Sequence, residues 1–237
     1  MPQRFALARH TSRLYLFLVG LLVAPGCRSP VRTIAPAGMS PVDAATVTAW
    51  AAPFAPQTRQ RYVLVWTYRT ASGAAKGRAA VRIAPPDSLR FDFRGPLGKS
   101  GAAVVIGDSG IWSRPETDFR DILGAAPLFW AAFGMPRPPA KGSTVTGSEA
   151  DGRRAWQYVV ASDTFTFVVA AGSPKRILAE LRREGKTVGL AEATFTVSGD
   201  RVASSKLDFP AAESRFSFTV DSVVSAEAFG PDTWRRP

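Results

Sequence analysis

The sequence is almost without the two side chains on which most hydrolytic and zinc centres depend. Its 237 residues include one histidine, His10, and one cysteine, Cys27. His10 falls within the amino-terminal leader, so the remainder has no histidine for a Ser-His-Asp triad, a Cys-His pair or a zinc site. The carboxylates Asp87 and Asp92 lie five residues apart, which places them on opposite faces of a regular strand. A hydrolase would have to use carboxylates, lysine or a Ser-Lys pair alone, and it would need a polar cleft with clustered carboxylates. We expect no catalytic residue, no metal and no cofactor.

The leader has no apolar run long enough to span a bilayer. Its run covers residues 14–24, eleven residues, whereas a spanning helix needs about 20. The run follows a basic stretch, which is the order of a signal peptide. It ends in APGC, and small residues before a cysteine resemble the lipobox of bacterial lipoproteins. The resemblance implies that residues 1–26 are a lipoprotein signal peptide and that Cys27 is acylated; an ordinary cleaved signal with an incidental cysteine is the alternative.

Acidic residues are in the minority, and the formal charge is +11 at pH 7. The positive residues are scattered, and no run of lysine or arginine exceeds two. A basic balance suits nucleic acid or anionic lipid headgroups, and for an exported lipoprotein we expect lipid and no nucleic acid. The candidates to meet headgroups, or the acidic surface of a carrier protein, are Arg78, Arg82, Arg90 and Arg94. A solvated strand face is the alternative for these arginines.

Proline and small residues dominate residues 27–41, which we interpret as a lipidated cysteine followed by a flexible tether. A single domain, residues 42–237, follows the tether. Ser40 is expected to cap a short helix that Pro41 opens. Trp50 would pin this helix to the domain.

Apolar and polar residues alternate along most of the chain after residue 60. The clearest case is Leu89, Phe91 and Phe93, which alternate with charged residues as in a half-buried strand. Short strands joined by turns predict an antiparallel meander of roughly ten or eleven strands. Residues 174–184 are ambiguous between strand and helix, and we favour strand.

Residues 116–134 instead carry apolar residues at three- and four-residue steps. This spacing predicts one or two helices with a break near Pro127 and an end at Gly134. The stretch LFWAAF is apolar on nearly every side, so the helix must be buried against a core, a ligand or a membrane.

Two stretches have the pattern of a known family. Residues 88–106, SLRFDFRGPLGKSGAAVVI, show a strand of basic and apolar residues, then Pro-Leu-Gly, then a strand of small and apolar residues. Residues 127–136, PLFWAAFGMP, show Pro-Leu, a tryptophan and then Gly-Met-Pro, as in the helix of that family. Together they resemble the LolA/LolB family of lipoprotein carriers and receptors, LolB above all. The resemblance covers most of residues 42–225. It implies a mainly β fold, a strongly curved antiparallel sheet that forms an incomplete barrel closed by short helices.

The resemblance also implies a function. Proteins of this family bind the acyl chains of lipoproteins in an apolar cavity and deliver them to the membrane. An exposed leucine helps to release the cargo in LolB, and Leu97, between Pro96 and Gly98, falls on that position. The candidate cavity lining is Trp66, Phe91, Phe93, Trp112, Phe129, Trp130, Phe133, Tyr158 and Phe167. The alternatives are a hairpin leucine packed on its neighbours and aromatic residues that fill a solid core.

We expect a monomer that is lipid-anchored at the periplasmic face of the outer membrane and that contacts lipids, the membrane surface and a periplasmic carrier protein. Arg28, rather than an aspartate, follows the cysteine, which favours the outer membrane. A second hypothesis is a structural or regulatory lipoprotein of the same fold, with a filled core and a protein partner. The two hypotheses differ in whether the concave side has room for a hydrocarbon tail.

Overall fold

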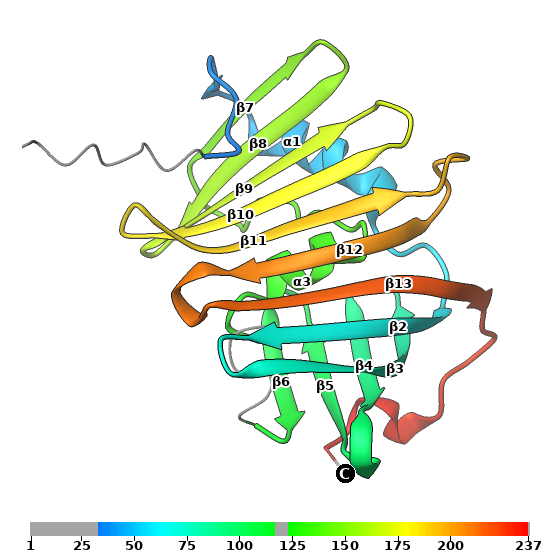
Figure 1. Ribbon diagram of the computed structural model, residues 1–237. Coiled ribbons are helices and arrows are strands. Elements are labelled where there is room, and N and C mark those ends of the chain that lie inside the picture. The colour runs from blue at the N-terminus through cyan, green and yellow to red at the C-terminus, as the bar shows by residue number, and fades with distance from the viewer. Residues whose placement is uncertain (1–32, 117–122, 237) are drawn as a thin grey trace, which may run out of the picture. The chain divides into compact units, whose positions relative to one another are not determined.

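The alternating segments form one antiparallel sheet in the computed structural model, which describes residues 33–116 and 123–236 (Figure 1). The described residues belong to one compact unit, Arg32–Pro237. The strands are β1 Ser40–Pro41, β2 Gln60–Thr70, β3 Gly73–Ala84, β4 Ser88–Arg94, β5 Ser100–Ile106, β6 Ser109–Arg114, β7 Val145–Ala150, β8 Arg153–Val160, β9 Asp163–Ala170, β10 Arg176–Arg183, β11 Lys186–Phe195, β12 Val202–Phe209 and β13 Ser214–Ser225. The predicted mainly β, antiparallel fold is confirmed, and the ambiguous segment 174–184 contributes strand β10.

The sheet is open. Its strand order is β1-β7-β8-β9-β10-β11-β12-β13-β2-β3-β4-β5-β6, so β1 and β6 are the two outer strands. The last strand, β13, lies beside β2 near the start of the domain, with Phe218 opposite Trp66. This long-range pairing joins the strands of the early and late parts of the chain into one curved surface.

Two of the thirteen strands, β1 and β7, were not predicted. Gly147 weakens the strand pattern in β7, since glycine is depleted in strands. The structure shows why glycine is needed there. A Cβ atom at this position would lie 2.8 Å from Val42 and 3.0 Å from the ring of Trp50, so the strand can pass only without a side chain.

The first helix, α1 Ala44–Ala51, continues into a 3-10 turn, η1 Ala52–Phe54. Its cap is Asp43, whose carboxylate accepts a hydrogen bond from the backbone N–H of Ala45 at 3.0 Å. The prediction that Ser40 caps the helix was wrong, because Ser40 is extended and pairs with Gly147 of β7. Trp50 packs against the core as expected.

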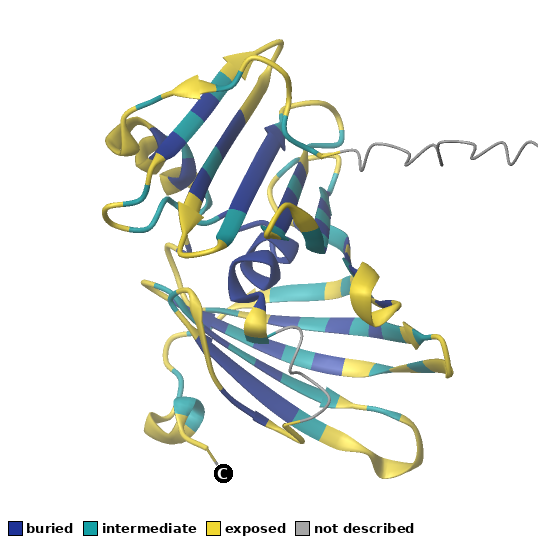
Figure 2. Cartoon of the chain, turned by 90° about the vertical axis from the view of Figure 1, so that its left-hand side faces the viewer, coloured by how far each residue is buried: buried dark blue, intermediate teal, exposed yellow. Residues whose placement is uncertain are grey.

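The second described helix, α3 Ala126–Ala132, lies inside the curve of the sheet (Figure 2). All seven of its residues are buried. Ala125 has non-helical backbone angles and separates α3 from the helical residues 123–124, so the predicted break near Pro127 is confirmed. Gly134, with φ of 80°, ends α3 against Phe195 and Val202. The part of the predicted helix in residues 117–122 lies outside the described residues. Neither α3 nor any other described helix is long and apolar enough to cross a membrane.

The core is the layer between the concave face of the sheet and α3. On β2, β3 and β4, alternate residues such as Leu64, Val81 and Phe91 are buried on this face. The intervening residues face the opposite side, which we call the outer face. Three further 3-10 turns are η2 Pro96–Gly98, η4 Pro210–Ala212 and η5 Pro231–Trp234.

Candidate functional site

The connection between β4 and β5 is a tight turn that carries Leu97 at its tip. The N–H of Gly95 donates to the carbonyl of Lys99 at 2.8 Å, and the N–H of Lys99 donates to that of Pro96 at 3.1 Å. These bonds close the turn around Leu97, whose side chain is 99% exposed. The alternative of a leucine packed on its neighbours is therefore wrong.

The backbone of Leu97 is in the left-handed region, with φ of 54° and ψ of 33°. This conformation costs an L-residue roughly 1–2 kcal/mol, and glycine or asparagine adopts it more readily. Strained backbone and an exposed large apolar side chain are both unfavourable for a folded monomer. Their coincidence at one residue points to a role outside the fold.

A tryptophan supports this turn from the concave side. The indole N–H of Trp66 donates to the carbonyl of Arg78 at 3.2 Å. A Cβ atom at Gly95 would lie 3.5 Å from the ring, and one at Gly77 would lie 2.7 Å from it and 1.9 Å from the carbonyl of Arg94. Gly77 is thus a position where only glycine fits, and Trp66 connects the tip to the core.

The aromatic residues predicted to line a cavity are brought together on the concave face, with one exception. Trp112 belongs to a separate cluster on the outer face, with Ala102, Val104 and Trp234. The register between β5 and β6 shifts next to Val104, and a β-bulge of this kind reverses which side chains face the core. The assignment of Trp112 to the cavity is therefore corrected.

The remaining rings form a nearly continuous series from the tip to α3. Trp66 meets Phe93 with ring centroids 5.6 Å apart and Phe216 with centroids 6.5 Å apart. The further contacts are Phe216–Phe91 at 5.7 Å, Phe91–Phe129 at 5.9 Å, Phe129–Phe133 at 5.3 Å and Phe133–Phe218 at 4.8 Å. These rings touch one another, so side chains occupy this part of the interior. Phe216 and Phe218 were not among the residues predicted for the site.

The other predicted residues extend this core. Trp156 and Tyr158 stack on Phe167, with centroids 5.5 and 6.0 Å apart. Burial raises the pKa of Tyr158 strongly, and its hydroxyl has no hydrogen-bond partner among the described residues. The indole N–H of Trp130 donates to the carbonyl of Gly107 at 2.7 Å, which ties α3 to the turn between β5 and β6.

The two carboxylates considered for catalysis take part in ion pairs with arginine. Asp92 pairs with Arg82 and, at 2.9 Å, with Arg90. Asp87 lies 3.6 Å from Arg137, which also pairs with Asp108. Within the described ranges, no group of three or more His, Cys, Asp or Glu side chains is placed to hold a metal ion. The geometry of the site is thus apolar and aromatic, with an exposed leucine at one end.

The open antiparallel sheet that curves around a short apolar helix also occurs in solved structures of other proteins. A putative outer membrane lipoprotein-sorting protein domain from Vibrio parahaemolyticus shares it, with a TM-score of 0.51 and 4% identity, over 81% of this chain and 97% of that one. The predicted likeness to LolA and LolB is confirmed at the level of the fold.

Two further solved structures are similar with lower scores. A DUF1329 family protein from Desulfovibrio piger matches with a TM-score of 0.45 and 9% identity, over 81% of this chain and 95% of that one. A LolA superfamily protein from Nitrosomonas europaea matches with a TM-score of 0.36 and 8% identity, over 82% and 98%. No protein-family model matches the chain, and no curated protein sequence matches it.

Proposed function

We propose that this protein is an outer-membrane lipoprotein that binds the acyl chains of lipoproteins, or related lipids, and delivers them to the membrane. The observation that carries the proposal is Leu97, an apolar side chain held in solvent by a strained turn. Its function is binding and transfer rather than catalysis. Cys27 would supply the anchor and lies outside the described residues.

Leu97 is suited to enter the headgroup region of a bilayer. Burial of a leucine side chain is worth about 1.5–3 kcal/mol, which is returned when the tip inserts. Arg94 and Lys99 flank the turn and are exposed, so they would lie among anionic headgroups, where each basic residue adds about 1 kcal/mol. The tip would thus bring the concave face to the membrane surface in a defined orientation.

The series of aromatic rings provides an apolar route from this tip to the interior. An acyl chain needs a dry apolar lining, and the concave face supplies one from Trp66 to Phe133. The rings must move apart to admit it, because they touch one another in this structure. Helix α3 is the element to move, since it is only seven residues long and ends at Gly134.

Delivery is tested with the variant Leu97→Glu. A charged tip cannot enter the apolar layer, so we expect transfer of a lipoprotein to vesicles to be lost while acyl-chain binding is kept. The matched control is Val197→Glu, because Val197 is an apolar residue that is 86% exposed at the turn between β11 and β12. Transfer should be normal in this control. Normal transfer by Leu97→Glu would overturn the assignment of the tip.

Binding is tested with the unacylated variant Cys27→Ser. Mass spectrometry of lipid extracted from the purified protein should detect bound acyl chains, and an added fluorescent fatty acid should be taken up. Absence of both would contradict the transport function.

The packed rings of the core favour a second candidate. A structural or regulatory lipoprotein of the same fold would keep its interior filled and would bind a protein partner. It would take up no fatty acid, and Leu97→Glu would weaken the binding of that partner instead of lipid transfer.

A further inference from the structure

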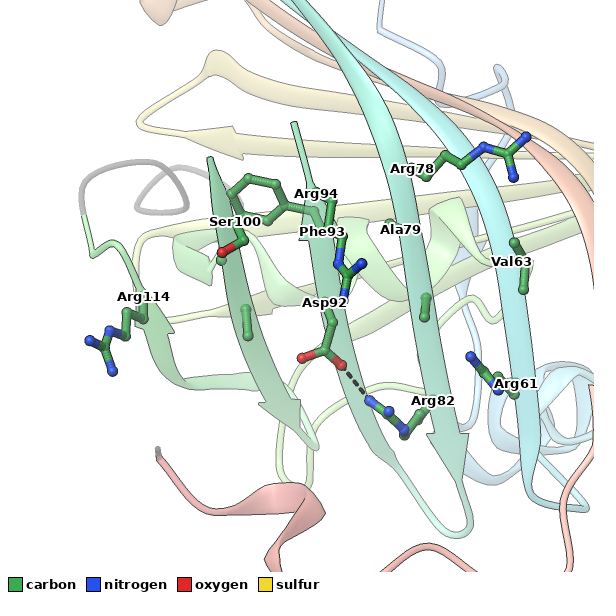
Figure 3. Close-up of a pocket in the computed structure, with 13 residues that line it drawn as sticks. Arg61, Val63, Arg78, Ala79, Arg82, Asp92, Phe93, Arg94, Ser100 and Arg114 are labelled. Carbon is green, nitrogen blue, oxygen red and sulfur yellow. Dashed lines mark hydrogen bonds and ion pairs between the residues drawn. The ribbon is translucent and has the colours of Figure 1, made fainter. Parts of the chain in front are cut away.

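The outer face of β2 to β6 carries a basic pocket that acyl-chain binding does not use. Its volume is about 890 Å³, and the charged residues that line it are Arg61, Arg78, Arg82, Asp92, Arg94 and Arg114 (Figure 3). These arginines alternate along their strands with residues of the core, so their side chains lie on the opposite side of the sheet from α3.

The strand register explains why a hollow forms there. Short side chains follow one row across the sheet, with Val63 opposite Ala80 and Ala102 opposite Asp92. On either side of this row stand long side chains from the neighbouring positions of the same strands. The row of small residues is therefore the floor of the pocket, and arginines are its rim.

The rim places like charges directly opposite one another. Arg78 is paired with Arg94 across β3 and β4, while Arg82 is opposite both Arg61 on β2 and Arg90 on β4. Like charges in directly opposed positions destabilise a sheet. An arrangement that costs stability at three cross-strand pairs calls for a compensating anion.

The one carboxylate that lines the pocket compensates only some of these positive charges. Asp92 pairs with Arg82 and Arg90. Among the described residues, no carboxylate forms an ion pair with Arg61, Arg78, Arg94 or Arg114, which are all exposed to solvent. Four guanidinium groups around one floor thus remain available to a ligand.

We propose that this pocket binds a phosphate group, carried by the headgroup of an anionic lipid. A guanidinium group binds phosphate through two parallel N–H donors. Several guanidinium groups around one site favour a phosphate dianion, or a phosphodiester that carries further polar groups. The volume exceeds that of a phosphate ion and has room for a headgroup. Arg94 and Ser100 line the pocket and flank the turn that carries Leu97. The lipid source of the phosphate rests on the proposed membrane function, whereas the phosphate site itself does not.

The proposal is tested by calorimetric titration of the protein expressed from the full sequence. The probes are inorganic phosphate, glycerophosphoglycerol as the water-soluble headgroup of phosphatidylglycerol, and polyglutamate as an acidic protein surface. The test variant is the double substitution Arg78→Gln with Arg94→Gln. It removes a cross-strand repulsion, so it should fold at least as stably as the parent protein, which thermal unfolding checks. The control, Arg153→Gln with Lys186→Gln, makes the same charge change at exposed positions distant from β2 to β6.

We expect glycerophosphoglycerol to bind the parent and the control equally and to bind the test variant on the order of tenfold more weakly, or worse. Tighter binding of glycerophosphoglycerol than of inorganic phosphate supports a lipid headgroup as the source. Equal binding of the two supports the same site with free phosphate as its ligand. The proposal is overturned if inorganic phosphate and glycerophosphoglycerol each bind the test variant as tightly as they bind the control. If only polyglutamate binds the test variant more weakly than the control, this face is a protein-docking surface and the proposal is likewise overturned.

The variant Leu97→Glu separates this inference from the proposed function. Leu97 does not line the pocket, so this variant should titrate like the parent protein. If Leu97→Glu binds the probes like the parent protein and also transfers lipoprotein normally, the phosphate site is supported and the transport function is contradicted. If Leu97→Glu loses transfer and the parent protein binds no phosphate, the transport function is supported and the phosphate site is contradicted.

Discussion

At the scale of single residues, Leu97 combines two features that lower the stability of the fold. Its left-handed backbone and its exposed side chain both oppose folding. Asparagine tolerates the left-handed region and is polar. We expect Leu97→Asn to raise the free energy of unfolding by up to about 1 kcal/mol and to weaken binding to vesicles. Chemical denaturation and vesicle flotation measure the two effects.

Ala161 offers a control for the backbone part of this effect. It lies in the turn between β8 and β9 with φ of 53°, nearly the same as that of Leu97, but has a small side chain. Ala161→Asn should stabilise the protein by a similar amount and leave vesicle binding unchanged. If Leu97→Asn kept full vesicle binding, the leucine would have no membrane role and its strain would lack an explanation.

At the scale of elements, the strand β10 holds the amino-terminal segment through a buried carboxylate. Glu180 is fully buried on the outer face, where it accepts hydrogen bonds from the hydroxyl of Thr33 at 2.8 Å and from the N–H of Ile34 at 3.2 Å. It also accepts one from the hydroxyl of Thr187 at 2.7 Å, and Arg182 lies 3.9 Å away. These contacts fix the point at which residues 33–34 meet the domain.

We expect Glu180→Ala to lower the free energy of unfolding by about 2–4 kcal/mol, because it removes the three hydrogen bonds that Thr33, Ile34 and Thr187 donate to a charged acceptor. Protease should also cut near residues 33–34 more readily, since their contacts are lost. The control is Glu192→Ala on the neighbouring strand, where a half-buried carboxylate pairs with Lys206 at 2.8 Å and should contribute at most about 1 kcal/mol. Equal effects of the two substitutions in denaturation and limited proteolysis would show that Glu180 does not hold the segment.

Most strands could be predicted from the sequence because their period-two alternation is local. The errors arise where a second element decides the outcome. Gly147 lies in a strand because it pairs with Ser40 of β1 and Trp156 of β8, and Trp112 faces outward because of a bulge beside Val104. Asp43 caps α1 because pairing with β7 holds Ser40 extended.

In the candidate site, too, the features set by local sequence could be predicted and those set by a second element could not. Proline and glycine on either side of Leu97 indicated a tight turn, and the turn leaves the leucine exposed. The alternation of arginines on β3 and β4 was visible, but the placement of Arg78 opposite Arg94 depends on the register of the hairpin. The contact of Glu180 with Thr33 joins residues 147 positions apart, and no local pattern indicates it.

At the scale of the whole described unit, α3 and the residue that follows it pack on several strands of the concave face. Leu128 packs so closely on β11 that a Cβ atom at Gly189 would lie 2.7 Å from it. Phe133 stacks on Phe218 of β13 and meets Tyr62 of β2 edge-on at 5.8 Å. A hydrocarbon tail can reach the concave side of these strands only if α3 moves away from them. A carrier must therefore exchange contacts of α3 for contacts with lipid, whereas a filled structural protein keeps them.

This difference predicts a change in hydrogen exchange when a fatty acid is added. The amides of Phe133, Gly134 and Met135 are bonded to carbonyls of Trp130 and Ala131, so they report whether the end of α3 stays folded. We expect these amides to exchange faster in the lipid-loaded protein, while amides of the β8–β9 pair keep their rates. Mass spectrometry of peptides from residues 126–136 measures the effect. Unchanged exchange at α3 with fatty acid bound would place the lipid elsewhere, and the concave face would then serve as core alone.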